Sequence, residues 1–301
     1  MFRKFGIALG ALAAMAPGLA MAATGQPSPG ELGLQGSVTP IMDSIHAFHD
    51  GILLTVAVGI SLLVLVLLAV IILRFNARRN PVPARFTHNT LIEVIWTALP
   101  VIILVIIAIP SFAVLTDQVT MPDGVRKYLG SNIFSFGSVE VPAPGLTVKA
   151  TGSQWYWTYD YVDEDKSFDS NLLSEEDRLK ENPVQPRLLA VDNMLVVPVD
   201  TTVRVQVTGA DVIHAFAVPS FGVIMDAVPG RLNETWFNVR KEGVYYGQCR
   251  ELCGKDHAFM PIAVRVVSKE QFATWMNALK AGSVTDANKT LPPLSAEQPA
   301  A

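Results

Sequence analysis

Two uncharged apolar runs, at residues 51–73 and 94–116, dominate the hydrophobic pattern in the first half of the chain. At about 1.5 Å per helical residue, each run covers about 30–35 Å, enough for the hydrocarbon core of a bilayer. Pro100 and Pro110 lie within the second run, and membrane helices tolerate proline more readily than helices in water. The pattern therefore predicts two transmembrane helices whose outer surfaces contact membrane lipid.

The segments around these runs predict a topology. Residues 74–85 contain four arginines and no acid, so the positive-inside rule places the loop 74–93 in the cytoplasm. Residues 1–22 have a basic start, a short apolar run and small residues before position 23, which is typical of a secretory signal peptide. The alternative for residues 1–22 is an N-terminal membrane anchor. For a bacterial source, we expect the inner membrane, with the N-terminus and the C-terminal domain in the periplasm.

The second half of the chain has a different pattern. A leader at residues 23–50 precedes the first run, and its part up to residue 40 is rich in Gly, Pro and Ser, which predicts a flexible segment. From 117 to 281, short alternating β-type runs predict an all-β sandwich or barrel, followed by a helix at 269–280. The β-type runs start at Leu146, Trp155, Met194, Thr202 and Ala263. The small, polar residues 282–301 predict a flexible tail.

Composition narrows the function. Half of the residues are hydrophobic, which agrees with membrane segments, and the net charge of −4 argues against nucleic acid as a partner. The chain has only two cysteines, so a disulfide framework is excluded. The meaning of the two cysteines must come from their neighbours.

The two cysteines belong to a loop of possible metal ligands. Cys249, Cys253, His257 and Met260 lie within twelve positions, and His214 on a separate apolar strand can add a second imidazole. Thiolate, imidazole and thioether are ligands that copper prefers. A local disulfide and a Cys₂His₂ zinc site are alternatives. A one-copper blue site needs only one cysteine; the second could bridge two coppers with one imidazole on each, which suits electron transfer.

Several motifs carry a family resemblance. The segments are the loop 245–261, Gln154–Tyr159, Val212–Ser220, Asp226–Asn233 and Glu93–Pro100. In this order they resemble subunit II of cytochrome c oxidase, from about Pro40 to Met276. The resemblance implies a cupredoxin-like domain on a two-helix hairpin, with two copper ions bridged by Cys249 and Cys253.

The resemblance also implies roles for single residues. His214 and His257 would each bind one copper, Met260 would be a weak axial ligand, and the Glu251 carbonyl would serve the other copper. The Glu251 carboxylate would help to bind magnesium or manganese shared with the core subunit. Trp155 would receive electrons from cytochrome c, and Trp157 would face the core of the domain.

The remaining expectations concern partners and protons. Asp160, Asp163, Glu164 and Asp165 form a possible docking rim for cytochrome c, although each could be an ordinary solvated acid. The resemblance places Glu93 at the mouth of a proton pathway into the core subunit; the alternative is a helix-start acid favoured by the helix dipole. With only two cysteines, no fused haem segment is possible, so the donor is a separate cytochrome c.

The leading hypothesis is the subunit that accepts electrons for a respiratory oxidase, whose haem-containing core subunit I reduces oxygen to water and pumps protons. A membrane-tethered copper carrier or assembly protein is the second hypothesis. Ligands dispersed over a strand and a loop favour a fixed site over a carrier. A quinol-oxidase relative that has lost its copper ligands is last, because all the ligands are present.

Overall fold

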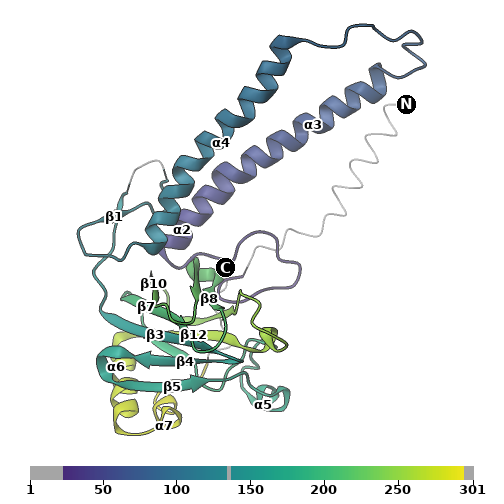
Figure 1. The fold of residues 1–301 in the computed structure, drawn as a ribbon. Helices are drawn as coiled ribbons and strands as arrows, with labels where there is room; N and C mark the ends of the chain where they lie inside the picture. The colour runs from purple at the N-terminus through teal and green to yellow at the C-terminus, as the bar shows by residue number, and fades with distance from the viewer. Residues whose placement is uncertain (1–22, 134–136, 295–301) are drawn as a thin grey trace.

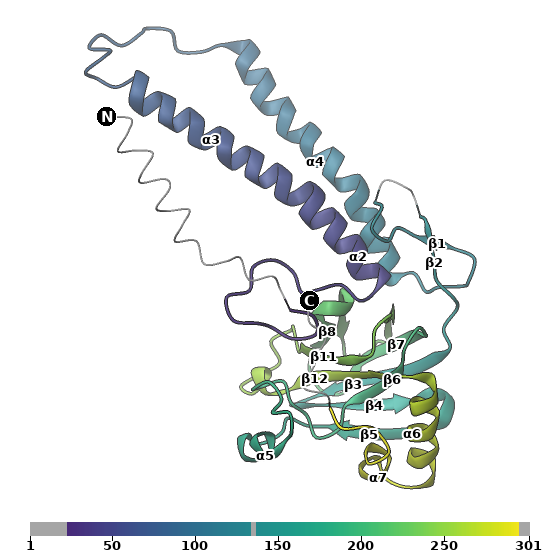
Figure 2. The same ribbon diagram turned by 180° about the vertical axis from the view of Figure 1, so that it is seen from behind.

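The computed structural model describes residues 23–133 and 137–294; the predicted signal segment 1–22 lies outside the described residues. Two long helices leave one end of a β-domain side by side (Figure 1). The view from behind shows the same arrangement, with α7 at the end of the β-domain remote from the long helices (Figure 2). The chain therefore has an elongated anchor and a compact domain.

The anchor consists of two helical stretches. The first runs through α2 (Pro40–His46), the π-helical η1 (Ala47–Leu53) and α3 (Leu54–Arg74), and the second is α4 (Thr90–Val119). Both are long and apolar enough to cross a membrane. The first begins well before the predicted residue 51, because Thr39 caps it and α2 continues directly into the apolar run. Asn89 caps α4 in the same way, by accepting a hydrogen bond from the backbone N–H of Ile92.

The β-domain is built from a five-stranded sheet, ordered β10-β7-β3-β4-β5, and a three-stranded sheet, ordered β11-β12-β6. A pair β8-β9 and a small pair β1-β2 complete the described sheets. The strands are β1 (Lys127–Tyr128), β2 (Val139–Glu140), β3 (Leu146–Ser153), β4 (Tyr156–Tyr161), β5 (Lys166–Ser170), β6 (Leu195–Pro198), β7 (Thr202–Gly209), β8 (His214–Val218), β9 (Val223–Ala227), β10 (Asn233–Asn238), β11 (Gly243–Gln248) and β12 (Pro261–Val267).

The core of the β-domain follows from alternation along the strands. In β4, Trp157, Tyr159 and Tyr161 are fully buried, while the residues between them are partly exposed. The inward residues of β3, β7 and β12 are mostly valines, which suit a pleated, buried surface. The predicted β-sandwich and the inward position of Trp157 are thus confirmed.

The C-terminal segment is ordered further than predicted. Helix α6 (Lys269–Ala281) begins at a capping box of Ser268 and Gln271, and a short α7 (Val284–Asn288) follows it. The indole N–H of Trp275 donates to the Asn288 side chain at 3.0 Å, so α7 packs back on α6. The expected flexible tail from residue 282 is therefore wrong for residues 282–294, because a few specific contacts order a segment of low hydrophobicity.

The leader is also ordered. The backbone N–H of Gly25 donates to the Ser220 hydroxyl at 2.8 Å, and the Gly25 carbonyl accepts from the Tyr246 N–H at 2.7 Å. Residues near Gly25 thereby cover the edge of β11 that does not pair with β12. The predicted flexibility of residues 23–40 is wrong, because Gly25 supplies backbone hydrogen bonds that hydrophobic patterning does not reveal.

A polar joint connects α4 to the β-domain. The Asp117 carboxylate, which is almost fully buried, accepts from the Leu129 N–H at 2.8 Å and from the Arg126 guanidinium at 3.0 Å. The Asp117 backbone carbonyl accepts from the indole N–H of Trp236 in β10 at 3.0 Å. The end of the second membrane-length helix is therefore fixed to the five-stranded sheet.

Candidate metal centre

The candidate ligands come from the loop between β11 and β12 and from the start of β8. Antiparallel pairing ends with Gln248 opposite Pro261, so residues 249–260 form a closed loop at this end of the sheet. Gly247 allows β8 to approach β11, because a Cβ there would lie 1.9 Å from the Ala217 carbonyl oxygen. This close approach brings His214 to the loop.

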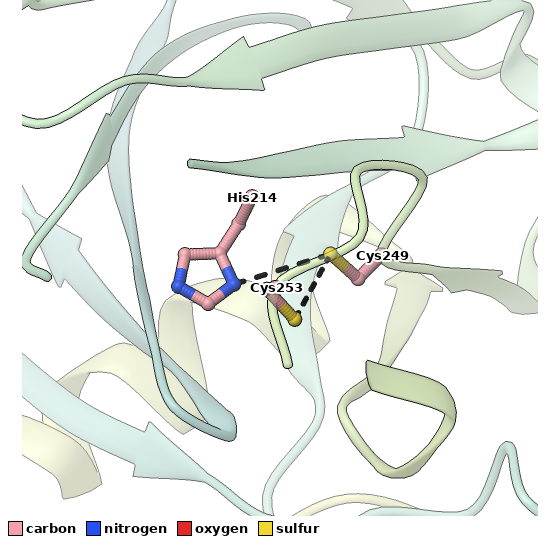
Figure 3. A group of neighbouring side chains, drawn as sticks. All are labelled: His214, Cys249 and Cys253. Carbon is pink, nitrogen blue, oxygen red and sulfur yellow. Dashed lines mark hydrogen bonds between the residues drawn. The ribbon is translucent and has the colours of Figure 1, made fainter. Parts of the chain in front are cut away.

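Three of the candidate ligands form one buried group (Figure 3). The Sγ atoms of Cys249 and Cys253 are 4.0 Å apart, and His214 Nδ1 lies 4.0 Å from Cys249 Sγ. Both cysteines are free, and the sulfur separation is about twice a disulfide bond length. The structure therefore presents two thiols to a shared space, and the local disulfide expected as an alternative is absent from this pair.

Each of the other predicted ligands lies next to one of the two cysteine sulfur atoms. His257 Nδ1 lies 3.5 Å and Met260 Sδ 3.4 Å from Cys253 Sγ, whereas the Glu251 backbone carbonyl oxygen lies 3.2 Å from Cys249 Sγ. Met260 is 1% exposed, and the Glu251 side chain faces solvent. All six predicted ligand residues are thus brought together. The donor set of two thiols, two imidazoles, a thioether and a carbonyl fits copper.

A second layer of hydrogen bonds fixes the ligands. His214 Nε2 lies 2.8 Å from an Asp211 carboxylate oxygen, which leaves Nδ1 turned toward Cys249. The Gln154 N–H donates to the other Asp211 oxygen at 2.8 Å, and the Gln154 side-chain amide donates to the Cys253 carbonyl at 2.8 Å. The indole N–H of Trp157 donates to the Met260 carbonyl at 3.3 Å.

Sequence reasoning did not assign a role to Asp211 or Gln154. The available signals were an acid three residues before His214 and an amide beside Trp155. The signal at Gln154 gained meaning only when the turn between β3 and β4 met the β11–β12 loop, since Gln154 and Cys253 are 99 positions apart. The candidate ligands are therefore easier to recognise in the sequence than the residues that orient them.

The two thiols have different acidities. Burial raises the pKa of Cys249, but the hydrogen bonds with His214 and with neighbouring backbone groups outweigh burial and bring the pKa below its ordinary value. Burial, together with the nearby charge of Cys249, raises the pKa of Cys253 to about 12. A thiol with a pKa of about 12 is protonated at neutral pH, so metal binding must displace the Cys253 proton.

The two tryptophans next to the loop differ as expected. Trp157 is fully buried and makes edge contacts with His214 and Phe216. Trp155 is half-buried. Its ring lies beside the loop, since a Cβ added at Gly254 would be only 3.0 Å away. Gly254 also has a φ of +128°, so this close contact depends on glycine.

The four acids proposed as a docking rim lie at the other end of β4. Asp160 lies five positions after Trp155, which corresponds to about 16 Å along a strand. Asp160 lies 3.6 Å from Lys149, and Glu164 forms an ion pair with Lys280. The rim is thus remote from the indole, and lysines partly neutralise it.

Glu93 occupies the first turn of α4, where its carboxylate accepts from the Asn89 backbone N–H at 3.4 Å. This contact matches the interpretation of Glu93 as a helix-start acid. A role in proton uptake stays a prediction.

A hairpin of membrane-length helices joined to a β-sandwich with a buried thiol, imidazole and thioether group defines a membrane-anchored copper protein of the cupredoxin type. Family models for cytochrome c oxidase subunit II match this chain twice: the periplasmic domain at residues 146–267 and the transmembrane domain at residues 27–114.

Individual relatives agree. The probable cytochrome c oxidase subunit 2 of Rickettsia bellii is 51% identical over 252 residues, covering 83% of this chain and 85% of the relative. The subunit 2 of Cereibacter sphaeroides is 42% identical over 290 residues, covering 91% and 89%. The crystal structure of the periplasmic domain of subunit II of the Bradyrhizobium japonicum oxidase is 56% identical, covers 50% of this chain and 99% of that chain, and has a TM-score of 0.42.

The chain belongs to the cytochrome c oxidase subunit II family. It is the subunit through which electrons reach the haem-containing core of a respiratory terminal oxidase, and hence part of an oxidoreductase complex. The hypothesis of a copper carrier or assembly protein is not favoured.

Proposed function

We propose that this chain accepts electrons from cytochrome c at a binuclear copper centre held by the loop 249–260 and His214. The observation that carries this proposal is the division of the donors into two sets. His214 and the Glu251 carbonyl lie next to Cys249, whereas His257 and Met260 lie next to Cys253. One imidazole and one weaker donor per sulfur, with the sulfurs shared, is the ligand set that two copper ions need.

The protein contributes rigidity and exclusion of water. Both cysteines and Met260 are buried, and Asp211, Gln154 and Trp157 hold the ligand-bearing groups by hydrogen bonds. When bound, the copper pair would supply reversible one-electron transfer. Ligands that are already in place need to move little between the two oxidation states, which favours fast transfer.

We assign the remaining site residues by position. The side chain of Glu251 is exposed to solvent, so its carboxylate can join a magnesium or manganese ion at the contact with core subunit I. The neighbouring Leu252 is 81% exposed, which suits a surface that another subunit covers. Glu93, on the loop side of α4, would serve proton uptake from the cytoplasm.

The proposed topology follows the arginines. The loop 74–93 lies in the cytoplasm, the two helices cross the bacterial inner membrane, and the β-domain lies in the periplasm. Signal cleavage before residue 23 would allow the leader to take its place along β11. The proposed domain limits are 1–22, 23–50, 51–73, 74–93, 94–116, 117–281 and 282–301.

For cytochrome c, we propose docking over Trp155, the half-buried indole next to the copper loop. Asp160, Asp163, Glu164 and Asp165 would then act through long-range attraction, because they lie along β4 away from the indole. A donor that contacts Trp155 directly need not touch these four acids.

Copper counting tests the centre. The full chain, purified in detergent and loaded with copper, should bind two coppers and give the paramagnetic resonance spectrum of one electron shared by two copper nuclei. Cys253→Ser should abolish the shared signal, whereas Ser153→Ala, beside β4 but outside the ligand set, should leave it unchanged. A single-copper blue spectrum from the unmodified chain would contradict the proposal.

A further inference from the structure

We propose that Lys255 determines which donor cytochromes the subunit accepts, by holding a positive charge over the indole of Trp155. This inference deepens the proposed function and rests on docking over Trp155. The Lys255 ammonium lies 5.7 Å from the centroid of the Trp155 ring. Its side chain is 79% exposed, whereas the indole is half-buried, so a protein that reaches the ring meets the ammonium.

The backbone of the copper loop fixes this arrangement. A Cβ added at Gly254 would lie 3.0 Å from the indole, so the backbone runs close to the ring there, and Lys255 is the next residue. The Gln154 amide, which immediately precedes Trp155, donates to the Cys253 carbonyl on the other side of Gly254. Both the ring and the start of the lysine side chain are therefore held by the same short stretch of the metal loop.

The nearby acids compensate the charge only in part. The Asp256 carboxylate lies 3.9 Å from the Lys255 ammonium, and both groups are solvent-accessible, so water screens the pair. Asp211 accepts from the Gln154 N–H and contacts His214, so its carboxylate is engaged with these groups. Lys255 therefore presents a solvent-exposed ammonium over the indole, with Asp256 as a weak, screened partner.

The surroundings of the charge are apolar. Ile213 and Phe259 are 47% and 45% exposed, and both flank metal ligands in the sequence. Docking against such side chains removes water, and a charge buried on docking must then find a partner. A donor with an acidic or neutral group opposite the indole satisfies this condition, whereas a lysine at that place is repelled by Lys255.

The test uses the assembled oxidase with Lys255→Met or Lys255→Glu, and Lys241→Met as the matched control. Lys241 is an exposed lysine at the opposite end of β11 from the copper loop. The donors are a basic cytochrome c and the same cytochrome after succinylation of its lysines. The measurements are kcat/KM at low and high ionic strength and the copper spectrum.

Lys255→Glu should raise kcat/KM for the basic donor by about three- to tenfold at low ionic strength, and lower it for the succinylated donor. Lys255→Met should give smaller changes of the same signs. Both effects should shrink as salt screens the charges, with the copper spectrum unchanged. Changes of the same sign for both donors, no change with either donor, or an equal effect of Lys241→Met would overturn the inference.

A Trp155→Phe variant separates this inference from the proposed docking site. If Trp155→Phe slows electron transfer but the Lys255 variants are silent, the indole receives electrons and the role of Lys255 is wrong. If the Lys255 variants change kcat/KM in opposite directions for the two donors and Trp155→Phe has no effect, donors dock over the lysine but electrons enter elsewhere. The Lys255 inference then stands, and the assignment of Trp155 fails.

Discussion

The two ends of strand β4 are held by different parts of the protein. At the copper end, Gln154 and Trp157 donate to the backbone carbonyls of Cys253 and Met260 in the metal loop. At the far end, the Tyr161 hydroxyl is bonded to both the carbonyl and the N–H of Val196 in β6, and its ring lies 5.4 Å from that of Trp275 in α6.

This difference separates the positioning of the metal ligands from the stability of the fold. Hydrogen bonds at the copper end restrain a loop that must hold its ligands in place. Contacts at the far end join the strand to β6 and α6, which carry no ligand. Changes at the far end should therefore lower the free energy of unfolding, while changes at the copper end should alter the metal spectrum.

The largest expected effect on stability comes from Trp275→Ala. The indole is fully buried among Tyr161, Phe168 and Phe272, so truncation leaves a cavity and should lower the free energy of unfolding by about 3–5 kcal/mol. Urea unfolding of the metal-free chain in detergent, followed by tryptophan fluorescence, measures the change. Copper spectra of the folded variant should match the wild type; an altered spectrum would break the separation between the two ends.

Tyr161→Phe should have a smaller effect on stability. The change removes the hydroxyl that satisfies both backbone groups of Val196, and their burial makes the loss cost about 1–3 kcal/mol. The same urea titration measures it. Tyr156→Phe, on the partly exposed face of β4, is the matched control and should shift the midpoint little. Equal losses from both variants would show that the hydroxyl of Tyr161 is unimportant.

Gln154→Leu should act at the copper end. The variant loses the hydrogen bond to the Cys253 carbonyl but keeps the backbone contact with Asp211, so the stability loss should be only about 0.5–1.5 kcal/mol. Because the loop carries the ligand, the copper spectrum should change and a chelator should remove copper faster. An unchanged spectrum with unchanged copper loss would contradict the role that we give to Gln154.

Glu164→Gln should have the smallest effect. Its ion pair with Lys280 is partly exposed, and such pairs contribute about 0–1 kcal/mol. Turnover with cytochrome c should change only slightly at low ionic strength and not at high ionic strength. A steady-state assay of the assembled oxidase checks this, and a large rise in KM would restore the four acids as a contact surface.

The candidate ligands could be grouped from the sequence because most of them lie close together. Cys249, Cys253, His257 and Met260 share one loop, so their chemistry can be recognised before any folding. Trp157 could be placed inward by simple alternation along a strand. The two membrane-length helices were equally evident from their uncharged runs.

Other features depend on tertiary contacts that local patterns do not contain. Asp211 is only three residues from His214, but it meets Gln154 only after the turn between β3 and β4 reaches the segment before β8. The ordering of the leader rests on the backbone hydrogen bonds of Gly25, which no hydrophobic pattern reports. Asp160 is near Trp155 in sequence, yet an extended strand carries it about 16 Å away.

The joint at Asp117 couples the orientation of the β-domain to the rotation of α4 about its own axis. Because the joint fixes α4 to β10, any rotation of this helix also rotates the copper loop. Each residue inserted into a helix turns the C-terminal remainder of the chain by about 100° and advances it by about 1.5 Å. One extra alanine in α4 before Asp117 would leave the metal ligands intact. The copper loop would, however, be turned about the helix axis and face a different side of the neighbouring membrane subunits.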